Sequence, residues 1–64
     1  MNFTYSVNSV VDYQTFTGEV RTVRVTRIEN DIKNGRSGFD GHLLDGPDTG
    51  MKVWGYDDQI VRVR

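Results

Sequence analysis

Asp40 and His42 come closest to catalytic chemistry in this chain of 64 residues. They lie two positions apart, so on a β-strand their side chains would share one face and could form a hydrogen bond. Nucleophilic and acid–base catalysis needs a base beside a nucleophile, but this pair has no obvious serine partner and the chain has no cysteine. We therefore expect a non-enzymatic protein. A small enzyme or ligand-sequestering protein built on Asp40 and His42 is the least favoured alternative.

Four aspartates in the second half of the chain could be imagined as metal ligands: Asp45, Asp48, Asp57 and Asp58. Their spacing does not match a calcium-binding loop, because Pro47 and Thr49 stand where oxygen ligands are needed. Aspartates in turns more often accept hydrogen bonds from nearby backbone N–H groups. We expect neither a metal nor a cofactor.

The basic residues could form a stripe that binds phosphate groups. If the last strand neighbours the strand at 20–28, Arg24, Arg62 and Arg64 would line up on one outer surface. The predicted stripe consists of Arg24, Lys33, Arg36, Arg62 and Arg64, with Arg21 and Arg27 as further members. The net charge of −1 and the sequence pI of about 5.6 favour an ordinary surface of mixed charge instead.

The aromatic residues are positioned by a predicted β-hairpin around a tight loop at 46–49. This loop would place Gly41 opposite Trp54 and Phe39 opposite Tyr56, with the aromatic side chains facing the core. Trp54 and Tyr56 could instead form a stacking platform or an aromatic cage on the outside. We favour the core, because exposing such large side chains would cost several kcal/mol in a small domain.

The same register leaves an apolar patch on the outer face near the loop: Leu44, Met51 and Val53. The N-terminal segment could cover this patch, or it could be the contact surface for a protein partner or for a second copy of the chain. The sequence is compatible with each of these three occupants.

The remaining elements follow from alternation and turn signals. We expect a strand at 3–7, a loop or second short strand at 8–17, and a strand at 18–28 that either carries bulges or bends sharply. These are followed by a polar loop at 29–37 with a tight turn at Asn34-Gly35, one 3₁₀ turn near 57–60, and a last strand at 61–64. The valines and threonines, seven glycines and lack of alanine also favour β structure. Residues 1–64 are expected to form one small all-β domain, a closed or nearly closed barrel of about five short antiparallel strands.

The chain resembles the SH3-like small barrels of the KOW and Tudor type. The resemblance begins with Gly18-Glu19 and the following valine-rich strand, continues through the spaced glycines of residues 35–43, and ends with the turn at 57–60 and the last strand. It covers roughly residues 18–64. It implies a binding module, in some members for nucleic acid, although those members are usually basic whereas this chain is acidic.

We therefore expect an accessory or regulatory protein that acts by binding. A protein partner or self-association is preferred over nucleic acid, and a membrane is not expected, because no apolar run approaches the length of a membrane span. The lack of cysteine and of a secretory signal favours the cytoplasm.

Overall fold

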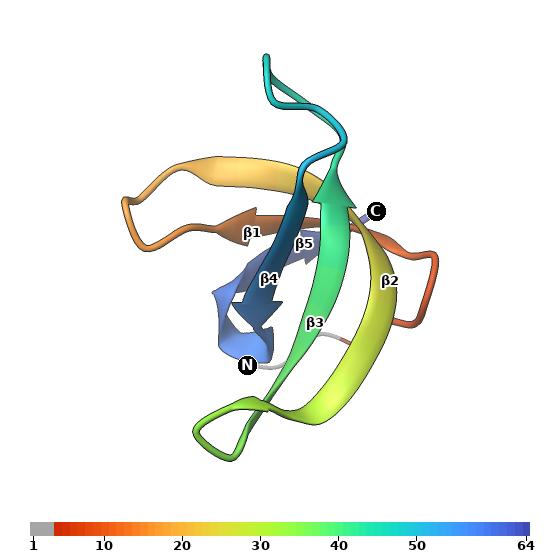
Figure 1. The fold of residues 1–64 in the computed structure, drawn as a ribbon, viewed down its shortest axis with the longest axis vertical. Coiled ribbons are helices and arrows are strands. Elements are labelled where there is room, and N and C mark those ends of the chain that lie inside the picture. The colour runs from red at the N-terminus through yellow and green to blue at the C-terminus, as the bar shows by residue number, and fades with distance from the viewer. Residues whose placement is uncertain (1–3) are drawn as a thin grey trace.

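The computed structural model describes residues 4–64, which form one antiparallel sheet of five strands with a single 3₁₀ turn (Figure 1). The elements are β1 (Val10–Gln14), β2 (Val20–Lys33), β3 (Arg36–Leu43), β4 (Lys52–Tyr56), the 3₁₀ turn η1 (Asp57–Gln59) and β5 (Ile60–Val63). The strand order across the sheet is β4-β3-β2-β1-β5. The predicted all-β fold of about five strands, with one 3₁₀ turn near 57–60, is confirmed.

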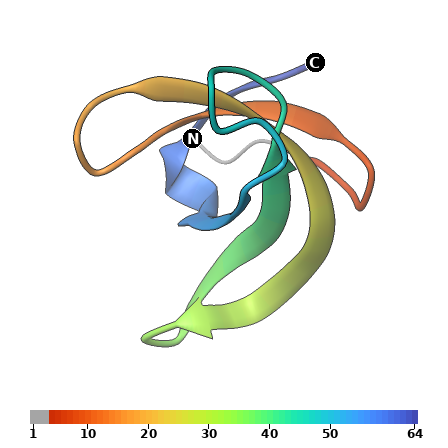
Figure 2. The same cartoon turned by 45° about the horizontal axis from the view of Figure 1, so that its top comes forward.

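The sheet is strongly curved but not closed, so of the two predicted forms the closed barrel is not observed. β4 and β5 form its two edges, and η1 connects them along the chain. The curvature follows β2, which pairs with β1 over its first part and continues in a long arc alongside β3 to the turn that the two strands share (Figure 2). Its pairing with β3 shifts register between Val25 and Arg27 and again between Glu29 and Lys33. Such bulges increase twist and bend a strand, which agrees with the bulged strand predicted here.

The polar loop expected at 29–37 is wrong, because β2 continues to Lys33 and β3 already begins at Arg36. Only the Asn34-Gly35 turn remains, and both residues have positive φ, 56° and 73°, as tight hairpin turns require. The Asp31 carboxylate accepts a hydrogen bond from the Gly35 N–H at 2.8 Å. The polar residues of this segment therefore form the end of a long hairpin.

The first part of the chain is less regular than expected. Of the two alternatives for residues 8–17, the strand is present as β1, followed by a turn. Tyr5 and Val7 lie outside any strand, contrary to the strand expected at 3–7, and residue 3 lies outside the described residues. The chain turns instead at Asn8, which has a φ of 75° and donates its N–H to the Val25 carbonyl at 2.8 Å.

The main core cluster lies on the concave side of the sheet; its members come from β1, β2, β3 and β5, while β4 adds the buried Tyr56 beside it. It comprises Val11, Tyr13, Val23, Val25, Phe39, Leu43 and Ile60, with Tyr5, Val53 and Val63 packed against it. The Phe39 ring is at its centre, edge-to-face with Tyr13 at 5.5 Å and with Tyr5 at 6.0 Å. Val23 and Val25 are fully buried, as their alternation with polar neighbours predicted.

The register expected for β3 and β4 is wrong by one residue. Gly41 faces Val53, and Phe39 faces Gly55, so Trp54 lies opposite Asp40 on the outer side of the sheet. A slip of one residue moves every side chain of a strand to the other face. The glycine that makes room for an aromatic ring is Gly55, because a β-carbon there would come within 2.8 Å of the Phe39 ring. Trp54 is therefore not a core residue.

Candidate functional site

Three aromatic side chains meet outside the core cluster: Phe16, Trp54 and Tyr56, which we call the aromatic surface. The ring centroids of Trp54 and Tyr56 are 5.2 Å apart at an interplanar angle of 89°. The Phe16 ring lies 6.2 Å from Trp54 and 6.4 Å from Tyr56, at angles of 62° and 78°. These edge-to-face pairs are a favourable arrangement of aromatic quadrupoles. The sequence placed Trp54 and Tyr56 inside. Tyr56 is indeed buried, at 7% exposure, whereas Trp54 is only partly buried.

Phe16 reaches this surface from the turn between β1 and β2. The Thr15 N–H donates to the Glu19 carbonyl at 2.7 Å, and the Gly18 N–H donates to the Thr15 carbonyl at 3.0 Å. Gly18 has a φ of 93°, a backbone conformation that favours glycine. Phe16 remains 77% exposed. Sequence reasoning missed it, although a large apolar residue between turn-forming residues signals a side chain held outside a core.

Two cations of the predicted stripe lie over these rings. The Lys33 ammonium is 4.9 Å from the centre of the Trp54 ring, and the Arg36 guanidinium is 3.9 Å from that of Tyr56. Both distances are within the range of cation–π attraction. Arg36 is also ion-paired with Asp58. The tight β2–β3 turn brings both cations to the aromatic surface, away from the other members of the stripe.

An open groove of about 400 Å³ lies beside Trp54 on the outer side of β2, β3 and β4. Its lining residues are Arg27, Glu29, Asp31, Ile32, Lys33, Asp40 and Trp54. Arg27 and Glu29 form an ion pair with each other. The groove therefore combines one indole ring with more carboxylates than cations.

The rest of the predicted stripe is interrupted, because β1 lies between β2 and β5. Arg24 faces Val10 across the sheet, and the Arg64 N–H donates to the Val10 carbonyl at 2.8 Å, so the two arginines lie on either side of Val10. His42 and then Lys52 continue this row on β3 and β4. A basic row across the outer face therefore exists, with a composition different from the predicted one.

Asp12 neutralises part of this row through its ion pair with Arg64. It is buried, accepts a hydrogen bond from the Thr22 hydroxyl at 2.7 Å, and is ion-paired with Arg64 at 3.2 Å. Arg62 is its neighbour on β5. Burial raises the pKa of Asp12. The hydrogen bonds from Thr22 and Arg64 and the nearby arginine charges together have a larger, opposite effect, so the pKa lies below its usual value.

The predicted apolar patch does not form one face. Leu44 and Met51 are exposed near the β3–β4 loop, at 41% and 57%, but Val53 packs against the core. The reason is again the register, because Val53 faces Gly41 on the inner side of the sheet. Two isolated apolar residues of this kind are ordinary on a protein surface.

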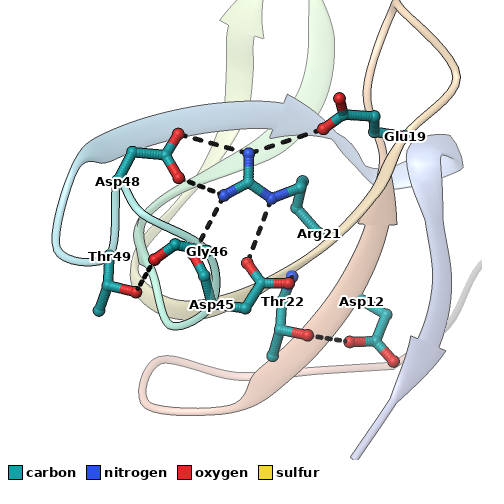
Figure 3. Close-up of polar contacts among 8 residues, drawn as sticks. All are labelled: Asp12, Glu19, Arg21, Thr22, Asp45, Gly46, Asp48 and Thr49. Carbon is teal, nitrogen blue, oxygen red and sulfur yellow. Dashed lines mark hydrogen bonds and ion pairs between the residues drawn. The ribbon is translucent and has the colours of Figure 1, made fainter.

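The β3–β4 loop is held by Arg21, which the sequence assigned to the stripe (Figure 3). Its guanidinium donates to the Asp45 carboxylate at 3.2 Å, to the Asp45 carbonyl at 3.1 Å and to the Asp48 carboxylate at 2.5 Å, with Glu19 at 3.8 Å. The Arg21 hydrogen bond lowers the pKa of Asp48. The Arg21 side chain is only 17% exposed. Arg21 is therefore a structural clamp of the loop and is not available to a ligand.

The remaining aspartates also have partners in the protein. Asp57 accepts hydrogen bonds from the Tyr5 hydroxyl at 2.5 Å and the Ser37 hydroxyl at 2.6 Å, which fixes the N-terminal segment against η1. Burial and the hydrogen bond to Asp57 raise the pKa of Tyr5. The Tyr56 N–H at the start of η1 is bonded by the side-chain oxygen of Gln59 at 2.8 Å, where the sequence suggested an aspartate. Within residues 4–64, no three acidic or histidine side chains converge on a metal-binding position.

Asp40 and His42 share the outer face of β3, as their spacing indicated, but they do not act on each other. Asp40 faces Trp54 and His42 faces Lys52. The hydrogen bonds of the described part of the chain include none between these two side chains. Their arrangement gives no support to a catalytic pair.

The chain was compared with protein-family models, curated proteins and solved structures, and no match was found. No helix among residues 4–64 is long and apolar enough to cross a membrane. The geometry of the site therefore carries the functional argument.

Proposed function

We propose that this protein is a non-enzymatic binding module of the SH3-like type, and that it acts on a protein partner through the aromatic surface. The meander of β1 to β4, the 3₁₀ turn before β5, and the return of β5 to the side of β1 support the assignment to SH3-like barrels. The curvature of the sheet also agrees with this assignment, although its edges are not joined.

The observation that carries the proposal is the exposed Phe16 packed on Trp54 and Tyr56. None of the three rings belongs to the main core cluster, although Tyr56 is itself buried at 7% exposure and only Phe16 is largely exposed. Exposed aromatic residues are unfavourable in water, and aromatic residues are enriched at the centres of protein interfaces. A partner that covers Phe16 would remove its apolar area from water at little cost, because the turn already holds the side chain in place.

The test is a pull-down with the tagged protein from an extract of the organism that encodes it, at low and high salt, with and without nuclease. We expect a partner that survives nuclease and high salt, and whose capture is lost with Phe16→Ala. Val20→Ala is the matched control, because Val20 is also apolar and is 52% exposed, but lies outside the aromatic surface. Capture by Phe16→Ala equal to that by the unmodified protein would contradict the proposal.

A second candidate function is binding of nucleic acid or ribonucleoprotein, as in KOW modules, through Arg24, Lys33, Arg36, Arg62 and Arg64. The placement of Arg24 and Arg64 on either side of Val10, with Lys52 further along the same row, supports it. Three results would favour this function over a protein partner: capture that disappears with nuclease, capture that falls as the salt concentration rises, and weaker capture by Arg24→Ala.

A further inference from the structure

We propose that the groove beside Trp54 binds a lysine or arginine side chain of a basic peptide segment, and that Lys33 occupies this position in the free protein. Lys33 would then act as an internal competitor that the ligand displaces. This inference rests on the proposed function, since it specifies the chemistry of the partner at one end of the aromatic surface.

The lining of the groove carries more negative than positive charge. Its lining contains the carboxylates of Glu29, Asp31 and Asp40, and the only cations are Arg27 and Lys33. Arg27 is already paired with Glu29. When Lys33 leaves the groove, two negative charges remain in excess beside the indole ring. A partly desolvated aromatic face with acidic neighbours favours a cation and repels a phosphate group.

Lys33 itself lies over the Trp54 ring. Its ammonium group lies 4.9 Å from the centre of the Trp54 ring, so the protein already places a cation where we expect the ligand's cation to bind. Indole gives the strongest cation–π attraction among the aromatic side chains. Lys33 thus shows what kind of group the site accepts.

Lys33 is easier to displace from its ring than Arg36. Both lie over aromatic rings, but Arg36 is also held by the ion pair with Asp58. None of the ion pairs among residues 4–64 involves Lys33. Its flexible stem at the end of β2 can move into water, because a single exposed cation–π contact is weak.

The test uses Trp54, the only tryptophan of the chain, as a fluorescent reporter. The protein is titrated with a short peptide of alternating lysine and glycine, its arginine counterpart, its glutamate counterpart, and a short oligothymidylate. We expect the two basic peptides to change Trp54 emission at saturable concentrations, and the glutamate peptide and oligothymidylate to leave it unchanged.

The sign of the Lys33→Ala effect distinguishes the ligand classes. Removing an internal competitor should tighten binding of the basic peptides by about two- to five-fold, the range of one exposed cation–π contact. A nucleic-acid ligand would instead lose a cation and bind more weakly. Lys52→Ala is the matched control, because it removes the same charge from β4 opposite His42, away from the groove lining. Asp40→Asn should weaken binding of the basic peptides.

Equal effects of Lys33→Ala and Lys52→Ala would overturn the inference, because the gain would then reflect net charge alone. Absence of basic-peptide binding in both the unmodified protein and Lys33→Ala, or binding of oligothymidylate that falls with Lys33→Ala, would also overturn it. These results are separate from the fate of the proposed function, which depends on whether Phe16→Ala abolishes capture of a nuclease-resistant partner. Far-UV circular dichroism of each variant verifies that it is folded.

Discussion

Phe39 and Trp54 should differ sharply in what they contribute to stability, because they lie on opposite faces of the β3–β4 hairpin. Phe39 is fully buried and contacts two tyrosine rings edge-to-face. Replacing a buried phenylalanine by alanine costs about 3–5 kcal/mol through lost burial and the cavity left behind. A chain of 64 residues has a free energy of unfolding of only about 3–10 kcal/mol. Phe39→Ala should therefore be close to unfolded.

Trp54→Ala should be much milder. Trp54 loses two edge-to-face contacts and one cation–π contact on the outer side of the sheet. With each contact at the lower end of its range, the contacts alone amount to about 1.5 kcal/mol, and the lost partial burial of the indole adds to this. An interior Trp54, as the sequence register predicted, would instead give a loss as large as that of Phe39.

Urea unfolding followed by far-UV circular dichroism measures both variants, since this signal does not require the tryptophan. Phe39→Leu keeps the comparison measurable if Phe39→Ala does not fold, with an expected loss of about 1–1.5 kcal/mol. A Trp54→Ala variant as unstable as Phe39→Ala would refute the observed register and return Trp54 to the core.

Three further predictions concern the backbone and the titratable groups. Gly41→Ala should lower the free energy of unfolding in urea by about 3 kcal/mol or more, because the added β-carbon would lie 2.4 Å from a backbone oxygen of β2. Gly50→Ala should lower it by only about 1 kcal/mol, because the space around Gly50 is open and only its φ of 94° is unfavourable for alanine. The Arg21 contact lowers the pKa of Asp48 in the folded state, so the stabilisation from this contact is present above a pH of about 4 and is lost below it. The difference in melting temperature between the unmodified protein and Asp48→Asn should therefore shrink as the pH falls from 5 to 2. The raised pKa of Tyr5 has the opposite consequence, because the folded state holds the phenol proton more tightly; the melting temperature should fall more steeply above a pH of about 10 in the unmodified protein than in Tyr5→Phe.

Local signals were sufficient wherever one short segment determines its own structure. The alternation around Val23 and Val25 identified a strand with one buried face, and both side chains are fully buried. Asn34-Gly35 marked a tight turn because both positions need positive φ. The aspartates after β4 marked the 3₁₀ turn, although Gln59 forms the hydrogen bond at its start.

The register of the β3–β4 hairpin could not be predicted locally, because its loop is fixed by a distant residue. Arg21 binds Asp45 and Asp48 from 24 and 27 positions earlier in the chain. One residue of error in that loop was enough to exchange the inner and outer faces of β4. The location of the aromatic surface depended on this exchange.

The prediction of a basic stripe was wrong for a related reason. Its geometry depended on which strand β5 would join, and the amino-acid pattern of a short strand does not specify its neighbour. β5 pairs with β1 rather than with β2, so Arg62 faces the buried Asp12 instead of joining Arg24.

The pairing of β1 with β5 also has a kinetic consequence. Strands β2, β3 and β4 follow one another through turns, so their contacts form between residues close in sequence. Contacts between β1 and β5, such as that between Asp12 and Arg64, join residues 52 positions apart. Closing so long a loop is entropically costly, and proteins dominated by distant contacts fold slowly. We expect the β2–β4 meander to form early, the docking of β5 on β1 to come late in folding, and this same seam to open first when the domain unfolds.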